Sequence, residues 1–580
     1  MHATCNLQPA TYNLQLTTPM HNLTRSQKAR VAVRNFKVIA DALALRGYFR
    51  PSGKMGQALA DCLRALRPEI YGSMNDPRVV ELKGLEYVID RLPRSIEKAT
   101  RLTLTEEEPF SEQRFERIVP LKRRRSCYRI SENELCFVIT RGLSEIYDIL
   151  THLTFLNIEA KKIRSRMTDD SGNVTVEWQA LTDAVEKVGA MSGSELDKAI
   201  WNLGLILGRS YQETRKTYEY LESTKERAAS SGLFDIVYHL GNRVFREEAS
   251  NENLQIVYMT PSLINVISHQ RYGQKWSDDI KSKLGALGLD KRPLHIISAN
   301  LHSVVNLLYG YAAAKACRVS PENTNDPLYA FIECIREYRG DIIDYALQHG
   351  FYEMPDQSGT HIDCQVIDTA QLASVSMHPD LKIAQRESRE QAPVILVMDY
   401  AFGAQAFEVM DCLLNPFFDA MENPINVVSI SIMGKAGILA GGKGEIMLAG
   451  AHVIEGSSDN YMVENDLDAN DFDADMPVYT GPMVTVLGTS LQNRDMLLRL
   501  QNSWKAVGLE MEGGHYQRAI SGAVIKGHIP KDIKIRYAYY ASDNPLESGQ
   551  TLAAGEMGPE GIRPTYMVTK VILERILAVS

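Results

Sequence analysis

The spacing of apolar residues divides the chain into two regions that meet near Pro293. From Thr24 onward, apolar residues recur at mixed spacings that include threes and fours, which places many of them on one side of a helix. This periodicity predicts a first helix that begins near Thr24 and further helices at 55–67, 79–100, 133–166, 176–188, 194–206, 210–230 and 233–248. The pattern therefore predicts a large all-α N-terminal domain over residues 20–288.

Beyond Pro293, short apolar runs alternate with helical spacing. The runs predict strands at or near 294–300, 361–367, 393–399, 427–433, 482–488 and 533–540. Helical spacing predicts helices at 301–314, 326–337, 339–349, 404–414 and 565–578. Such alternation is typical of a layered fold, so residues 289–580 are predicted to form a three-layer α/β domain with a mixed central sheet. Residues 1–19 show no helical period and are predicted to be a disordered leader.

Composition and charge argue against a nucleic-acid-binding protein and against a transmembrane protein. A chain of 580 residues is too long for one ordinary core, which agrees with more than one domain. Its 44% hydrophobic and 23% charged content is typical of a soluble globular protein, and a net charge of −9 does not favour nucleic-acid binding. No apolar run reaches the about 18 residues of a transmembrane helix. We therefore expect a cytoplasmic protein without nucleic-acid or membrane partners.

Candidate metal and phosphate sites are few. The eight cysteines lack CxxC pairing, which favours reduced thiols over a zinc or disulfide framework. Asp466–Asn470 begins like a calcium loop, but Asp471 stands at the glycine position and Pro477 at the last ligand position, so no metal is expected. The basic cluster Lys122–Arg125 is predicted to be a solvated surface loop in preference to a phosphate site.

A glycine-rich stretch carries the main candidate chemistry. Val427–Leu448 reads as an apolar strand, a segment with glycines at 434, 437, 441, 442 and 444, and a second apolar run. Glycines let a backbone approach a ligand closely and leave N–H groups free to hold an anion. Taken alone, the stretch is either a pocket floor or a tight turn between two strands.

Three further segments place polar groups at expected strand ends. Asp399 to Ala404 joins a strand to a helix, and Ser542-Asp543 ends a strand. Glu510-Met511-Glu512-Gly513-Gly514 joins a strand to a helix, and in a regular strand Glu510 and Glu512 would share one face. For Met511 and Glu512 to reach one ligand the chain must leave strand geometry, which Gly513-Gly514 permits.

These motifs, in this order, resemble the nucleoside phosphorylase and nucleosidase superfamily. The resemblance covers about residues 290–580 and rests on Phe402-Gly403-Ala404, Gly434-Lys435-Ala436-Gly437 with Gly444-Glu445-Ile446, the Met511-Glu512 pair and Ser542-Asp543. It extends to purine nucleoside phosphorylases and to AMP nucleosidases, which also carry a domain ahead of the catalytic one. The resemblance implies cleavage of the N-glycosidic bond of a purine nucleoside or nucleotide, in a homo-oligomer.

The resemblance also implies a role for each matching residue. Asp543 is the catalytic acid that donates to N7 of the leaving purine, Glu512 accepts hydrogen bonds from the ribose hydroxyls, and Met511 packs beneath the sugar. Chemistry agrees, because the departing base gains electron density while positive charge grows on the sugar. The base is expected near Leu491, Gln492 and Asn493. The phosphate or nucleophile is expected near Gly403, Gly434, Lys435, Asn300 and His302.

Departures from the superfamily pattern leave alternatives open. Lys435 stands where threonine or cysteine is usual, Glu445 replaces an aspartate, and no residue clearly matches the arginines that hold phosphate in phosphorylases. Hydrolysis and phosphorolysis therefore both remain, with no cofactor expected except phosphate as a co-substrate of phosphorolysis. A sensor that binds nucleotides without cleaving them, with the helical domain as its output, is the second hypothesis. A nucleotide-depleting stress or defence effector is the third.

Overall fold

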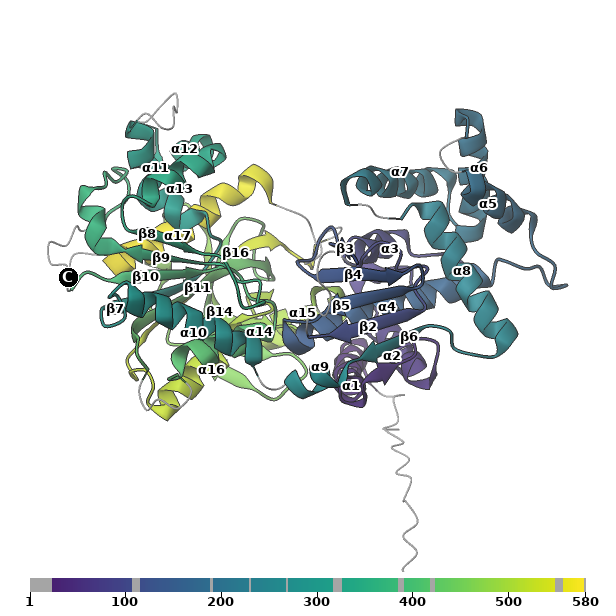
Figure 1. The fold of residues 1–580 in the computed structure, drawn as a ribbon, viewed down its shortest axis with the longest axis horizontal. Helices are drawn as coiled ribbons and strands as arrows, with labels where there is room; N and C mark the ends of the chain where they lie inside the picture. The colour runs from purple at the N-terminus through teal and green to yellow at the C-terminus, as the bar shows by residue number, and fades with distance from the viewer. Residues whose placement is uncertain are drawn as a thin grey trace, which may run out of the picture.

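Two β-sheets organise the chain, one in each half. The computed structural model describes residues 23–106, 115–187, 191–228, 231–267, 270–316, 326–383, 391–417, 423–547 and 557–577. The ten-stranded sheet belongs to the C-terminal half and the six-stranded sheet to the N-terminal half, and the two lie side by side (Figure 1). The expected leader, residues 1–19, lies outside the described residues.

The C-terminal sheet mixes parallel and antiparallel neighbours, as predicted. Its path is β13-β12-β14-β15-β11-β7-β10-β9-β8, and β16 pairs with β11 and β12. β7 is parallel to β10 and β11, whereas β15 runs antiparallel to β11. The strands are β7 Pro293–Ser298, β8 Phe351–Met354, β9 Cys364–Asp368, β10 Val394–Met398, β11 Asn426–Ile438, β12 Ile446–Ile454, β13 Asn460–Met462, β14 Val478–Thr485, β15 Gly508–Glu510 and β16 Lys534–Asp543.

Helices cover both faces of this sheet, which confirms the predicted three layers (Figure 1). One face packs against α11 Ser303–Lys315, α12 Leu328–Ile335, α13 Arg339–Ala346 and α17 Ile562–Leu577. The other packs against α10 Arg271–Ala286, α14 Gln405–Leu414 and α16 Gly513–Lys526. Each face has its own hydrophobic core, because alternate strand residues point to opposite sides. The fully buried β10 is apolar throughout for the same reason.

The N-terminal half is not all-α, and this part of the prediction is wrong. It contains the sheet β1-β6-β2-β5-β4-β3. Its strands are β1 Tyr48–Phe49, β2 Arg101–Thr105, β3 Glu116–Ile118, β4 Ser126–Ser131, β5 Glu134–Val138 and β6 Ile256–Met259. The predicted helix 133–166 merges β5 with the helix that follows it, because both are apolar. Gly142, with φ +64°, marks the break between them.

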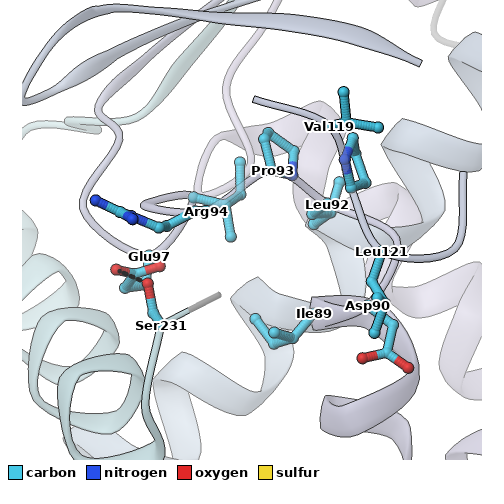
Figure 2. A pocket seen from close by; sticks show the side chains of 11 residues that line it. Ile89, Asp90, Leu92, Pro93, Arg94, Glu97, Val119, Leu121 and Ser231 are labelled. Carbon is cyan, nitrogen blue, oxygen red and sulfur yellow. Dashed lines mark hydrogen bonds between the residues drawn. The ribbon is translucent and has the colours of Figure 1, made fainter. Parts of the chain in front are cut away.

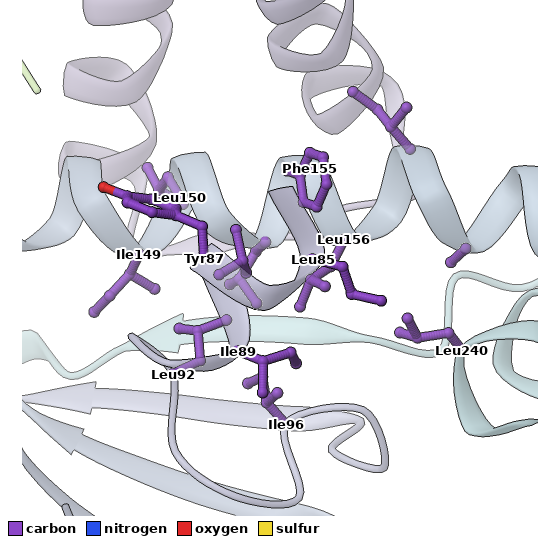
Figure 3. Close-up of a cluster of buried hydrophobic side chains, with 14 of the residues drawn as sticks. Leu85, Tyr87, Ile89, Leu92, Ile96, Ile149, Leu150, Phe155, Leu156 and Leu240 are labelled. Carbon is purple, nitrogen blue, oxygen red and sulfur yellow. The ribbon is translucent and has the colours of Figure 1, made fainter. Parts of the chain in front are cut away.

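A large helical region is nevertheless present, as predicted. Its helices are α1 Arg25–Arg46, α2 Lys54–Leu66, α3 Leu82–Ile89, α4 Gly142–Arg164, α5 Val176–Lys187, α6 Gly193–Leu207, α7 Tyr211–Ala228, α8 Leu233–Ser250 and α9 Pro261–Val266. The helix α4 is buried on most of its surface and forms the centre of this half. Figure 3 shows its residues Ile149, Phe155 and Leu156 in the core beside Leu85 and Tyr87 of α3. The predicted helix 79–100 ends early, since turns that include Pro93 follow α3.

The connection between the halves runs through α10. Its residues Trp276, Ile280 and Leu284 pack in a core of the C-terminal sheet, although the sequence places them before residue 288. The domain limits at 288 and 289 stay predictions. No helix in the described ranges is long and apolar enough to cross a membrane.

Candidate functional site

Three strands meet at Gly437, and their ends carry the predicted site residues. Gly437 of β11 pairs with Leu509 of β15 on one side and with Asp543 of β16 on the other. The chain beyond β15 and the end of β16 therefore flank the same part of β11. Gly434 to Gly437 lies within β11, so the expected turn at these residues is in fact extended strand. The reversal of the chain occurs later, between Ile438 and Ile446.

Asp543 is a buried carboxyl group with one unused oxygen. Its side chain is 2% exposed, and Ser542 Oγ donates to Oδ1. Oδ2 is buried and has no hydrogen-bond partner among the described residues. Burial raises the pKa of Asp543 to about 6, against smaller opposing effects of Ser542, Lys435 and Lys443. The group can therefore be protonated near neutral pH and donate to a ligand.

Glu510 holds the turn that carries Met511 and Glu512. Its Oε2 accepts from the N–H groups of Glu512 and Gly513, and Thr485 donates to Oε1. β15 ends at Glu510 and α16 begins at Gly513, so the chain leaves strand geometry where the prediction required it. Glu512 is the N-cap residue of α16, with φ −121° and ψ −31°. Sequence reasoning missed this anchoring role of Glu510.

Glycine at 513 is required by close packing. A Cβ there would lie 2.3 Å from His452 Cε1 and 2.4 Å from the Tyr539 hydroxyl. His452 Nδ1 in turn lies 3.4 Å from Glu510 Oε1. The tight packing fixes the start of α16, and Glu512 lies at that start.

Glu512 is held from its other side by the turn after β10. The N–H of Gly403 donates to Glu512 Oε1 at 2.8 Å, so this donor positions the carboxylate in the present structure. Burial and the charge of Glu510 raise the pKa of Glu512 to about 8. A Cβ on Gly403 would lie 3.8 Å from Met511 Cε, which places Met511 beside the same turn.

The N-terminal half reaches this turn directly. Ser144, in the first turn of α4, accepts from the N–H of Ala404 at 2.9 Å. The guanidinium groups of Arg123 and Arg141 lie 5.4 Å and 5.0 Å from the centre of the Phe402 ring. Both halves of the chain therefore fix the backbone that binds Glu512.

A cavity of about 610 Å³ lies between the halves, at the ends of β7 and β10. Its lining includes Asn300, His302 and Tyr400 from the C-terminal half and Arg117 and Arg124 from the N-terminal half. Arg124 bonds to Asp399 across the interface at 2.5 Å. The volume is in the range of small-molecule sites. Arginines are thus present in the cavity wall, together with the carboxylates of Asp356, Asp363 and Asp399.

Asn300 and His302 lie together at the start of α11. Asn300 Oδ1 accepts from the N–H groups of His302 and Ser303. His302 Nδ1 lies 3.0 Å from the Tyr566 hydroxyl. Burial and then the charges of Arg339 and Arg336 lower the pKa of His302 to about 4, so its imidazole is neutral at pH 7.

Gly434 and Lys435 occupy different environments on β11. A Cβ on Gly434 would lie 3.4 Å from the Tyr400 ring, so Tyr400 covers this glycine. Lys435 is exposed, and its charge favours the ionised form of Asp543. The predicted contacts of Gly434 and Lys435 with a phosphate or nucleophile stay predictions.

The predicted base-binding residues pack against the N-terminal half. Leu491 belongs to its hydrophobic core, and Asn493 caps α15 Arg494–Trp504 while it donates to the carbonyl of Leu66. The carbonyl of Gln492 accepts from the N–H of Glu69. The three residues are thus fixed by interdomain packing, and their role toward a base stays a prediction.

The expected surface loop at Lys122–Arg125 is in part buried, which corrects that prediction. Arg125 is fully buried and bonds to Glu145 and Asp148 of α4, each at 2.9 Å. Arg123 also bonds to Asp148 at 2.9 Å. Paired carboxylates on α4 compensate the buried charges, and the sequence alone does not reveal that pairing.

A further pocket, beside α3, is small. Figure 2 shows the side chains that line it and the hydrogen bond from Ser231 to Glu97, which is 2.8 Å long. The volume of the pocket is about 10 Å³. It has room for about one water molecule. Within the described ranges, no three histidine, cysteine or acidic side chains are grouped so as to hold a metal ion.

Solved structures resemble about half of this chain. A 5′-methylthioadenosine/S-adenosyl homocysteine nucleosidase from Campylobacter jejuni has a TM-score of 0.30 and 9% identity, covering 50% of this chain and 99% of its own. A futalosine hydrolase mutant from Helicobacter pylori has a TM-score of 0.29 and 11% identity, covering 49% and 99%. Uridine phosphorylase from Schistosoma mansoni has a TM-score of 0.29 and 14% identity, covering 51% and 89%. Likenesses this weak support no particular activity.

Comparison at the level of sequence gives the family. No curated protein matches the chain. One family model, described as a family of unknown function (DUF6909), matches residues 57–320 and 336–578, which is most of the sequence. The chain therefore belongs to this family.

Proposed function

We propose that the protein cleaves the N-glycosidic bond of a purine nucleoside or nucleotide and releases the free base. The observation that carries the proposal is Asp543, a buried carboxyl group whose Oδ2 has no partner among the described residues and whose pKa is raised to about 6. Such a group can give a proton to a leaving base. Its place beside β11, with Glu512 following β15 on the other side, fits the motif resemblance.

The bond between C1′ and the purine nitrogen breaks with its electron pair on the base. Asp543 donates a proton to N7, so the base leaves without a full negative charge. Glu512, in its ionised form, accepts from the ribose hydroxyls and favours the positive charge that grows at C1′. An oxygen atom of water or of phosphate then bonds to C1′. Where water attacks, it loses a proton to solvent, and the Asp543 carboxylate takes up a proton from solvent before the next turnover.

The attacking water or phosphate is proposed to bind in the cavity between the halves. It contains Asn300 and His302 together with Arg117 and Arg124. Arginines bind phosphate oxygens through paired N–H groups, which favours an anion in this cavity. That anion is either a phosphate co-substrate or the phosphate of a nucleotide, and the proposal includes both hydrolysis and phosphorolysis.

The test is an incubation of the full-length protein with adenosine, inosine, guanosine, AMP and ATP, with and without phosphate, followed by chromatography of free base. Base that appears without phosphate supports a nucleosidase, and base that appears only with phosphate supports a phosphorylase. Asp543→Asn is the control for a contaminating enzyme. Absence of base from every substrate would contradict the proposal.

A second candidate is a nucleotide sensor. It is favoured by the contact between Ser144 of the N-terminal half and the turn that binds Glu512. In that case the same panel would give a bound but intact nucleotide after prolonged incubation.

A further inference from the structure

A second cavity lies where α1 of the N-terminal half faces β12 and α15 of the C-terminal half. It has a volume of about 440 Å³ and is enclosed by α1, α15 and the turn that follows β12. Its lining contains neither Asp543 nor Glu512, and it shares no residue with the cavity between β7, β10 and Arg124. We call it the α1–α15 cavity.

Three arginines face this cavity from two helices. Arg30 and Arg34 lie one turn apart on α1, and Arg499 lies on α15. Within the described part of the chain, no carboxylate lies within 4.0 Å of any of the three, although many other arginines are paired in this way. All three side chains are exposed to solvent, and together they give this wall of the cavity a positive charge that favours an anion.

An aromatic surface is present in the same cavity. Met496, Leu500 and Trp504 lie at helical spacing on the face of α15 that lines it. Trp504 is 40% exposed, whereas Trp178 and Trp276 are 2% and 3% exposed in hydrophobic cores. An accessible indole beside arginines offers a stacking surface for a planar base.

A glutamate with a buried carboxyl oxygen also lines the α1–α15 cavity. Glu455 follows β12 and lines the cavity, and its Oε2 accepts from the N–H of Leu487 at 3.0 Å. Its Oε1 is buried and has no hydrogen-bond partner among the described residues. A buried oxygen without a partner is unfavourable in a folded protein, and a donor group on a ligand would satisfy it.

We infer that the α1–α15 cavity is a second ligand site, and that it binds a nucleoside phosphate. The phosphate lies against Arg30, Arg34 and Arg499, and the base stacks on Trp504. A hydrogen-bond donor of the sugar or of the base bonds to Glu455. The inference does not depend on bond cleavage at Asp543, because no residue of that site takes part in it.

Tryptophan fluorescence tests the site directly. The full-length protein with Asp543→Asn, which keeps a substrate intact, is titrated with AMP, ATP and adenosine. AMP and ATP are expected to quench the emission, and adenosine is expected to bind at least about 10-fold more weakly because it makes no contact with the arginines. Equal quenching by adenosine, or no quenching by any of the three, would overturn the inference.

Two tryptophan variants locate the signal. Trp504→Phe should abolish the quenching, and Trp201→Phe is the matched control, because Trp201 is 59% exposed on α6, at the far end of the N-terminal half (Figure 1). Quenching that persists in Trp504→Phe would place the ligand elsewhere.

Arginine variants test the charge without changing any tryptophan. Arg34→Ala combined with Arg499→Ala should weaken AMP binding at this cavity by about 10-fold or more, as measured by the quenching of Trp504. Arg494→Ala is the control, because Arg494 is exposed on the same helix and does not line the cavity. Unchanged affinity in the double variant would refute the inference. Base release by the parent protein is scored separately, so its absence would contradict only the proposed cleavage.

Discussion

At the scale of single residues, the proposal depends on the protonated carboxyl group of Asp543. Asp543→Asn keeps the shape of the side chain and removes its ability to donate a proton from a carboxyl group. We expect turnover to fall by about 10²-fold or more, with substrate affinity largely unchanged. Single-turnover assays with a separate binding measurement check this. Turnover equal to that of the parent protein would exclude Asp543 from the chemistry.

The two raised pKa values predict the pH dependence. Activity requires protonated Asp543, which is lost as the pH rises above about 6, and ionised Glu512, which is gained as the pH rises toward about 8. Since the two requirements oppose each other, kcat/KM should rise up to about pH 6, stay level and fall above about pH 8.

A variant of Glu512 separates the two limbs of this profile. Glu512→Gln removes the rising limb, so its lower activity should only decline above about pH 6. It should also raise KM, because the ribose hydroxyls lose a charged acceptor. A rising limb that survives in Glu512→Gln would assign that limb to another group.

At the scale of elements, the sequence predicts long periodic segments better than short strands. The helix α1 and the buried strand β10 were predicted because their apolar patterns are continuous. The strands β3 and β6 were missed, since strands of three or four residues carry too little alternation to be recognised. Their pairing is set by tertiary packing, to which local sequence contributes little.

The turn that carries Gly403 gives a prediction for one element. Gly403 has φ +57°, and a Cβ there would lie 2.5 Å from Ser144 Oγ. A residue other than glycine in the left-handed conformation costs roughly 1–2 kcal/mol. Gly403→Ala should therefore destabilise the protein by more than this amount, because the new Cβ also meets Ser144. Gly288→Ala is the control, because Gly288 has φ +67° with open space around it. Denaturant unfolding measures both, and equal losses would show that the contact with Ser144 is unimportant.

At the scale of the whole molecule, two adjacent arginines of the N-terminal half have different partners: Arg124 bonds to Asp399 of the C-terminal half, whereas Arg125 pairs within its own half. Arg125 is fully buried between Glu145 and Asp148, whereas the side chain of its neighbour Arg124 is 67% exposed. Arg125→Met should cost about 3–5 kcal/mol of unfolding free energy, because two buried carboxylates lose a partner. Arg124→Ala should cost no more than about 1 kcal/mol.

The pH dependence of the Arg125 effect follows from the same pairing. Burial opposes ionisation of Glu145 and Asp148, but the arginines outweigh it and lower the pKa of both. Their stabilising effect is therefore present above the ordinary carboxyl pKa of about 4 and is lost as the pH falls. The difference between Arg125→Met and the parent protein should thus persist above about pH 4 and shrink as the pH falls below that value, as equilibrium unfolding can show. A difference that stays constant with pH would contradict the pairing.

The candidate site could be predicted from sequence only in part. Asp543, which ends β16, and Glu512, which caps α16, could be proposed because each belongs to a short motif of the C-terminal half. Arg117, Arg124 and Ser144 could not be found, since they belong to the other half and reach the site through tertiary packing. Nothing in their local sequence distinguishes them from surface residues.

The bond from Ala404 to Ser144 also limits how far the molecule can be shortened. A fragment that begins at residue 289 would retain Asp543 and Glu512, but the backbone that holds Glu512 would lose its support from α4. The C-terminal half alone therefore lacks one of the contacts that hold the backbone around Glu512. Genes that fuse or truncate the chain near that point would encode a protein in which the backbone around Glu512 lacks this hydrogen bond.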